Sequence, residues 1–275
     1  MTLAARNNFI RIATLMVLIL SVVCIAAFII MLVRGTIPSI PDQARPLGIL
    51  ATIPFMPHSP VAALAAISLL PLLSLTGLIY IMFAFEKTQT TEITFFAAGV
   101  FTLALEAFRI VIPFNELWMN TGFILAAVSR ISLFCRLFIV LCLLSSILFT
   151  TGETTQQIGP AIFLTAFFSF SLVNAVPFNT SNLTTTWVVP PGYSGMLYLF
   201  LGILGLLAAI SYRVQGRIRN APEYSRAAWG ILLLLAGYAL LIVCDSWILF
   251  GVGVFAIIQG AWRYLRQIHR YYLWQ

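Results

Sequence analysis

The chain has 275 residues, of which 61% are hydrophobic and only 8% are charged. Soluble domains carry about 25% charged residues, so a water-soluble fold is excluded and hydrocarbon must surround much of the exterior. The net charge of +7 does not indicate nucleic acid as a partner, because membrane proteins retain basic residues in their cytoplasmic loops. The expected partner is the lipid bilayer itself, including its anionic lipids.

Long apolar runs follow one another along the chain, and polar or Gly- and Pro-containing segments separate most of them. A transmembrane helix needs roughly 20 apolar residues, whereas barrel strands have about ten residues of alternating polarity. The sequence therefore predicts an all-α, single-domain, multi-pass bundle of about eight membrane-spanning helices. The predicted spans lie near residues 9–33, 61–85, 94–113, 123–149, 160–178, 196–212, 227–244 and 247–263.

The last two predicted spans follow each other with almost no polar segment between them. Residues 227–263 as one helix would be about 55 Å long at 1.5 Å per residue, far more than the membrane thickness. Asp245 and Ser246 are favourable residues for beginning a new helix, so we predict a break there. A tilted or re-entrant last segment, with seven spans in total, is the alternative.

Basic residues are distributed unequally between the two sides of the predicted bundle. With the N-terminus inside, cytoplasmic segments hold ten of the 15 Lys and Arg residues, and outer segments hold only Arg34 and Arg45. The positive-inside rule then predicts an even number of spans with both termini in the cytoplasm. We expect the chain in a plasma membrane, as the inner membrane of a bacterial-type cell.

Cofactors and metals are not expected. The four cysteines lie within apolar runs and form no Cys-x-x-Cys pair, and His58 and His269 fall on opposite sides of the predicted membrane. Neither a disulfide framework nor a zinc site follows from such a pattern. The chain also has no Gly-x-Ser-x-Gly, His-Glu-x-x-His or phosphate-binding glycine motif.

Charged residues within the third and fourth spans are the strongest functional signal. Glu106 and Arg109 share one helix face, Arg136 lies on the next span, and Arg130 points elsewhere on that span. Asn174 in the fifth span lies at a comparable depth. A charge at the bilayer centre costs about 2.5–3.5 kcal/mol on insertion scales, so these groups should face the bundle interior and pair. We expect Glu106 to pair with Arg109 or Arg130.

Two interpretations of these charges compete. In the first, they form a buried ion-pair network that only locks the third and fourth spans together. In the second, the excess of Arg over Glu106 binds the anionic group of a lipid or metabolite. The proposed ligand-binding residues are Glu106, Arg109, Arg130, Arg136 and Asn174. We predict that an outward-opening cavity between spans three, four and five holds this ligand under the loops 34–60 and 179–195. A proton relay is a third interpretation.

The C-terminal stretch is both basic and aromatic. Arg263, Arg266 and Arg270 share one helix face, with Trp262 and Trp274 nearby. Aromatic rings favour the headgroup region and Arg attracts anionic lipids, so these residues predict an interfacial anchor. Docking of a protein partner is the alternative interpretation.

This pattern favours a non-enzymatic function: a sensor-like or assembly subunit that binds an anionic small molecule, a lipid or a membrane protein partner. A transporter or permease subunit is the first alternative, although polar residues gather in the outer half rather than along a path through the membrane. An intramembrane lipid-modifying enzyme comes third, because only Glu106, His58 and Asp42 are available as outer-side acids or bases.

Overall fold

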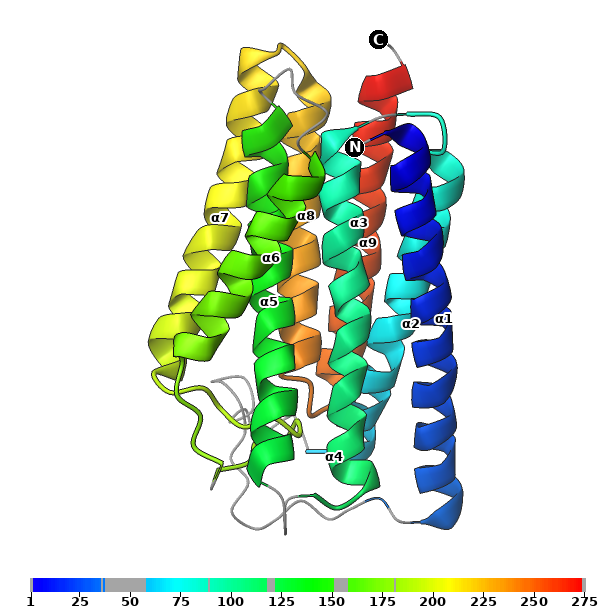
Figure 1. Ribbon diagram of the computed structural model, residues 1–275, viewed down its shortest axis with the longest axis vertical. Coiled ribbons are helices and arrows are strands. Elements are labelled where there is room, and N and C mark those ends of the chain that lie inside the picture. The colour runs from blue at the N-terminus through cyan, green and yellow to red at the C-terminus, as the bar shows by residue number, and fades with distance from the viewer. Residues whose placement is uncertain are drawn as a thin grey trace.

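The computed structural model describes residues 2–35, 37, 58–88, 90–117, 122–150, 158–180 and 182–273. Within these ranges the chain is an all-α bundle, as predicted, and eight helices are long and apolar enough to cross a membrane. The helices run roughly along one direction, and both termini lie at the same end (Figure 1). The long helices are α1 (Leu3–Arg34), α2 (Pro60–Ala84), α3 (Thr91–Leu105), α5 (Gly122–Thr150), α6 (Ile158–Ala175), α7 (Ser194–Ile218), α8 (Pro222–Ile242) and α9 (Trp247–Leu273).

Several helices extend beyond the apolar runs that predicted them. Helix α7 continues to Ile218 and α9 to Leu273, so the basic and aromatic C-terminal stretch forms the last turns of a helix. Hydropathy marks only the part of a helix that hydrocarbon surrounds, whereas the backbone hydrogen bonds continue into the interface. Most of the loop 34–60 and residue Trp274 lie outside the described residues.

The third span is interrupted. After α3 the chain forms a short 3₁₀ segment, η2 (Glu106–Ile110), and then α4 (Val111–Phe114). Pro113 lies inside α4 and has no N–H to donate to the carbonyl of Arg109, which weakens the regular helix there. The interruption coincides with Glu106 and Arg109, the charged residues of this span.

The predicted break between the last two spans is present. Helix α8 ends at Ile242, α9 begins at Trp247, and the Ser246 hydroxyl accepts a hydrogen bond from Leu249 N. The backbone carbonyl of Asp245 accepts a hydrogen bond from Ser59 N at 2.7 Å, which ties this corner to the beginning of α2.

Helices α8 and α9 pack against each other almost backbone to backbone. Gly230 and Gly237 on α8 face Gly260 and Gly253 on α9. A Cβ atom added at Gly260 would lie 2.4 Å from Leu234 N, and one added at Gly237 would lie 2.6 Å from Ile257 N. Small residues let transmembrane helices approach closely, so these four glycines define a closed seam between α8 and α9.

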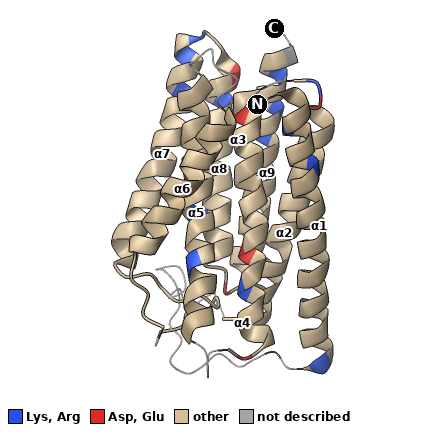
Figure 2. Ribbon diagram, viewed as in Figure 1, with Lys and Arg blue, Asp and Glu red and all other residues tan. Residues whose placement is uncertain are grey.

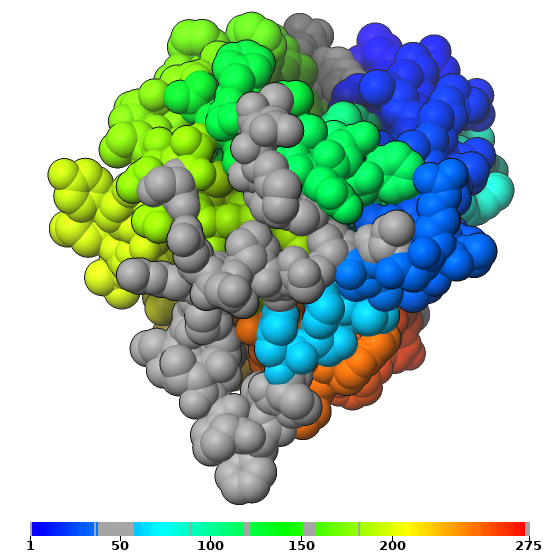
Figure 3. Space-filling model, turned by 90° about the horizontal axis from the view of Figure 1, so that it is seen from below, coloured from blue at the N-terminus to red at the C-terminus, as the bar shows by residue number. Residues whose placement is uncertain are grey.

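Helices α3 and α5 are the most buried in the bundle, whereas α1, α6 and α7 are mostly exposed at its periphery. The end opposite the termini is seen in Figure 3, where the beginning of α2 lies beside the α8–α9 region and the segment before α7 lies on the other side of the molecule. Part of that segment folds into the bundle: Trp187 is fully buried, and Val189 N donates a 2.9 Å hydrogen bond to Ser129 Oγ of α5. It therefore forms a folded element of the end opposite the termini.

Candidate functional site

A cluster of buried charged side chains lies near this end of the bundle, with Glu106 at its centre. The Glu106 carboxyl group is fully buried, and it accepts hydrogen bonds from Ser132 Oγ at 2.7 Å and from the Tyr238 hydroxyl at 2.9 Å. Arg109 Nη1 lies 3.4 Å from Glu106 Oε2, so the expected pair with Arg109 is present. Arg136 Nε lies 3.6 Å from Glu106 Oε1. The cluster joins η2, α5 and α8.

Local helix geometry explains why these groups meet. Glu106 and Arg109 are three residues apart, and Ser132 and Arg136 are four apart, so each pair shares one helix face. Arg136 Nη2 donates to Ser132 Oγ at 2.9 Å, and Ser132 in turn donates to Glu106. The serine thereby bridges the guanidinium of one span to the carboxyl group of another.

Arg109 also connects the cluster to the end of the bundle opposite the termini. Its Nη2 donates to the backbone carbonyl of Thr186 and lies 3.5 Å from the carbonyl of Ile242, the last residue of α8. Arg109 is 1% exposed. The folded segment before α7 and the end of α8 are thus held by the same guanidinium group that contacts Glu106.

Two predicted ligand-binding residues do not join this cluster. Arg130 is exposed on another face of α5, and its guanidinium lies 5.9 Å from the centre of the Phe178 ring. Asn174 is also exposed, and its side-chain amide donates to the Phe170 carbonyl within α6. Their depth in the predicted membrane is similar to that of Glu106, which suggested a shared site. Depth does not determine which side of a helix faces the bundle.

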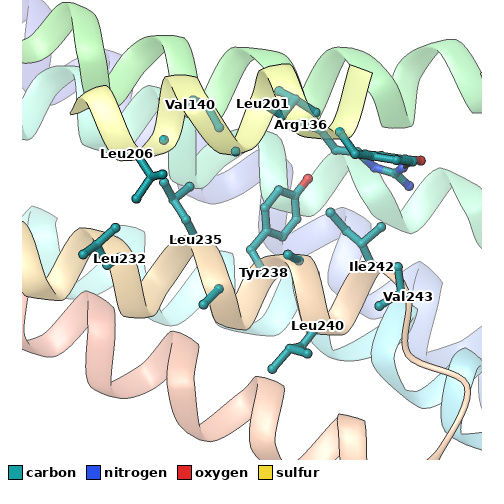
Figure 4. Close-up of a pocket in the computed structure, with 15 residues that line it drawn as sticks. Arg136, Val140, Leu201, Leu206, Leu232, Leu235, Tyr238, Leu240, Ile242 and Val243 are labelled. Atoms are coloured by element: carbon teal, nitrogen blue, oxygen red, sulfur yellow. Dashed lines mark hydrogen bonds between the residues drawn. The ribbon is translucent and has the colours of Figure 1, made fainter. Parts of the chain in front are cut away.

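A cavity of about 540 Å³ lies beside Arg136, between α5, α7 and α8. Our sequence-based expectation placed it between spans three, four and five, so this cavity is bounded by different helices. Figure 4 shows Arg136 toward one end, Tyr238 along the wall, and Leu206 and Leu232 toward the other end. Among the described lining residues, only Arg136, Tyr198 and Tyr238 have polar side chains. The cavity is therefore apolar along its length and cationic toward one end.

The cavity opens sideways. Four of its lining residues are also exposed on the outside of the molecule: Gly202 and Leu206 on α7, and Ala236 and Ala239 on α8. For helices that cross a membrane, the space outside this seam is lipid. The cavity is therefore open at the side of the bundle, between α7 and α8.

The hydrogen-bonding capacity of the guanidinium groups is only partly used. Arg136 Nη1 donates to the Tyr198 hydroxyl at 2.9 Å, and Nη2 donates to Ser132. The buried Nε atoms of Arg109 and Arg136 have no hydrogen-bond acceptor among the described residues. One carboxyl group, even when ionised, neutralises only one of two guanidinium charges, so an anion would be favoured here.

Sequence reasoning missed Tyr198 and Tyr238, which complete the polar end of the cavity. Both lie in or beside apolar runs, where a tyrosine hydroxyl must find a partner once it is buried. That requirement was the available signal, but it does not say which helix supplies the partner.

A second buried carboxyl group was also missed. Glu92, at the beginning of α3, is fully buried and accepts hydrogen bonds from the hydroxyls of Tyr224 and Tyr272. Next to it, the hydroxyls of Tyr212 and Tyr264 lie 2.7 Å apart. This tyrosine cluster lies toward the end that carries the termini and holds α3, α7, α8 and α9 together.

The remaining candidates lie apart from the cavity. His58 Nδ1 lies 3.8 Å from Asp245 Oδ2 at the α8–α9 corner, while Asp42 is outside the described residues. Burial raises the pKa of Asp245 above its ordinary value, and His58 acts in the opposite direction. No group of three or more His, Cys, Asp or Glu residues that could hold a metal occurs within the described ranges.

The predicted interfacial anchor falls on the last turns of α9. Trp262, Arg263, Arg266 and Arg270 are all exposed there, and the Arg266 guanidinium lies 4.9 Å from the centre of the Trp262 ring. Exposure is what an interfacial anchor requires, because the arginines must reach headgroups.

The chain is 23% identical, over 245 aligned positions, to an uncharacterized protein of Treponema pallidum (strain Nichols), and the match covers 71% of each chain. No family model and no solved structure matches.

Proposed function

We propose that this integral membrane protein is a non-enzymatic lipid-binding component, sensor-like or part of an assembly, which holds an anionic amphiphile between α5, α7 and α8. The observation that supports this function most is the cavity itself: about 540 Å³, apolar along its length, with the Arg136 guanidinium at its polar end. Ligand cavities are typically 300–1,000 Å³, with few, well-placed polar groups among apolar walls.

The lining favours binding over catalysis. Its polar side chains are one guanidinium and two phenol groups, of Arg136, Tyr198 and Tyr238. These groups bind and orient an anion through charge-assisted hydrogen bonds. The Glu106 carboxyl group is occupied by Ser132, Tyr238 and the two arginines.

The distribution of charge supports a proposed orientation in a bacterial-type inner membrane. Figure 2 shows most charged residues at the end that carries both termini. Basic residues are retained on the cytoplasmic side, so this end would be cytoplasmic. Reporter fusions after Arg219 and Gln275 should then read cytoplasmic and one near Thr184 external. An external Gln275 would contradict this orientation.

The binding function is tested with Arg136→Gln and its matched control Arg130→Gln, which removes the same charge from the exposed side of the same helix. Native mass spectrometry of the wild type and of Arg130→Gln should show a retained anionic amphiphile. Arg136→Gln should lower its retention by about tenfold or more, the value of a lost charge-assisted hydrogen bond. Equal retention in all three proteins, or none in any, would refute the proposal.

A further inference from the structure

The volume of the cavity limits the size of its occupant. A dry cavity of about 150 Å³ holds one benzene molecule, which corresponds to about 25 Å³ per carbon atom. On that scale the volume of about 540 Å³ has room for roughly 20 non-hydrogen atoms. One acyl chain with a small head group has about this many atoms, and a phospholipid with two chains has more than twice as many.

The shape of the cavity also fits a single chain. Its lining positions on α8 run from Leu232 to Ile242, which is about 15 Å at 1.5 Å per residue. This length is about half of the ~30 Å hydrocarbon core, or one leaflet. Tyr198 and Ile242 lie within about one turn of the outer ends of α7 and α8. The polar end therefore lies near one membrane interface, and the apolar part extends toward the bilayer centre.

The polar end offers donors for one anionic head. Arg136 is 3% exposed, and its Nη1 makes one hydrogen bond, to the Tyr198 hydroxyl, and keeps a second N–H. The Tyr198 hydroxyl accepts a hydrogen bond from Arg136, which leaves its own hydrogen for a second partner. A carboxylate or phosphate oxygen placed between these two groups would meet donors from both α5 and α7.

From these observations, and resting on the proposed lipid-binding function, we propose that the ligand is a monoacyl anionic amphiphile. Its carboxylate or phosphate head binds Arg136 and Tyr198. Its single acyl chain lies between α7 and α8 and extends toward Leu206 and Leu232. The ligand enters sideways, past Gly202 and Ala236, from the leaflet on the side of the 182–193 segment.

Gly202 provides a direct test of where the acyl chain of the ligand lies. A Cβ atom added at Gly202 meets no heavy atom within 4 Å, and the same holds for Gly195, the second residue of α7, which lies outside the cavity. Gly202→Leu therefore fills cavity space without a backbone clash, and Gly195→Leu is its matched control. Both variants should fold, because neither site is crowded.

The experiment measures binding of defined probes to the purified full chain in nanodiscs of neutral phosphatidylcholine. The probes are hexadecanoic acid, its monoacyl lysophosphatidic acid and dipalmitoyl phosphatidic acid. Wild type and Gly195→Leu should bind at least one monoacyl probe, and the better of the two identifies the head group. Gly202→Leu should weaken it at least about tenfold, the loss expected when two methylene groups leave an apolar site. Tyr198→Phe should weaken it as well.

The outcomes separate this inference from the proposed function. If the diacyl phosphatidic acid binds as tightly as the monoacyl probes and still depends on Arg136, the single-chain assignment falls and anionic-lipid binding stands. If Gly202→Leu and Gly195→Leu bind the monoacyl probe equally, the acyl chain of the ligand does not lie between α7 and α8. If no probe binds and Arg136→Gln behaves as wild type, both proposals fall.

Discussion

Helix α8 has two contrasting sides. Toward α9 it packs at backbone contact through the four glycines of the seam, whereas toward α7 it leaves a cavity large enough for an acyl chain. Hydrocarbon is as apolar as the helices, so transmembrane helices associate through close packing of small residues and through polar contacts, not through exclusion of water. Where the glycines face each other, the seam closes. Where Leu201 and Leu206 of α7 lie opposite Leu232 and Leu235 of α8, the cavity remains between the helices.

Of the changes considered, removal of the Glu106 side chain should lower the stability of the bundle most, because its carboxyl group joins α8 to η2 and α5 on the side of the cavity. Glu106→Ala leaves Arg109 and Arg136 buried without their carboxylate, and we expect a loss of about 3–5 kcal/mol in the free energy of unfolding. Thermal melting of purified protein in detergent measures it. Glu86→Ala, which removes an exposed carboxylate 3.8 Å from Arg11, should cost no more than about 1 kcal/mol. Similar melting of both variants would show that the Glu106 cluster does not hold the bundle.

The closed side is broken by Gly260→Ala. The new methyl group would lie 2.4 Å from Leu234 N and 2.8 Å from the Gly230 carbonyl oxygen, so α8 and α9 must separate. Overpacking of this kind costs about 1–3 kcal/mol. Gly251→Ala in the same helix meets nothing within 4 Å and should be neutral or stabilising by up to about 1 kcal/mol, because alanine favours helix. Equal melting temperatures for Gly260→Ala and Gly251→Ala would contradict the close packing described above.

The smallest effect concerns the corner that joins the two helices. Burial raises the pKa of Asp245 in the folded state, so the folded protein binds this proton more tightly than the unfolded chain does. The resulting stability is complete below the unfolded value of about 3.9 and is lost as pH rises through the higher folded-state value. Asp245→Asn should flatten that part of the stability–pH curve and leave the Ser59 contact to the backbone intact. An unchanged slope would show that Asp245 does not contribute.

The helices could be predicted well from the sequence, because a long apolar run by itself indicates a segment that lies in hydrocarbon or in the bundle interior. The sequence also predicted that Glu106 pairs with Arg109, since three-residue spacing places both on one face. The position of the cavity could not be predicted in this way. Tyr198 and Tyr238 belong to helices far along the chain, and helical periodicity does not reveal which helix faces which. The seven-residue spacing of Gly230 and Gly237, repeated by Gly253 and Gly260, is visible in the sequence. Their pairing became evident only in three dimensions.

The sideways opening between α7 and α8 has a consequence for how the proposed ligand would reach its site. A ligand that enters there never crosses water, so its supply is its mole fraction in one leaflet and not a concentration in the cytoplasm or outside the cell. Occupancy would then follow the composition of the membrane, rising when single-chain anionic lipids accumulate through synthesis or breakdown. The same protein placed in membranes of different composition would be filled to different extents without any change in its own affinity.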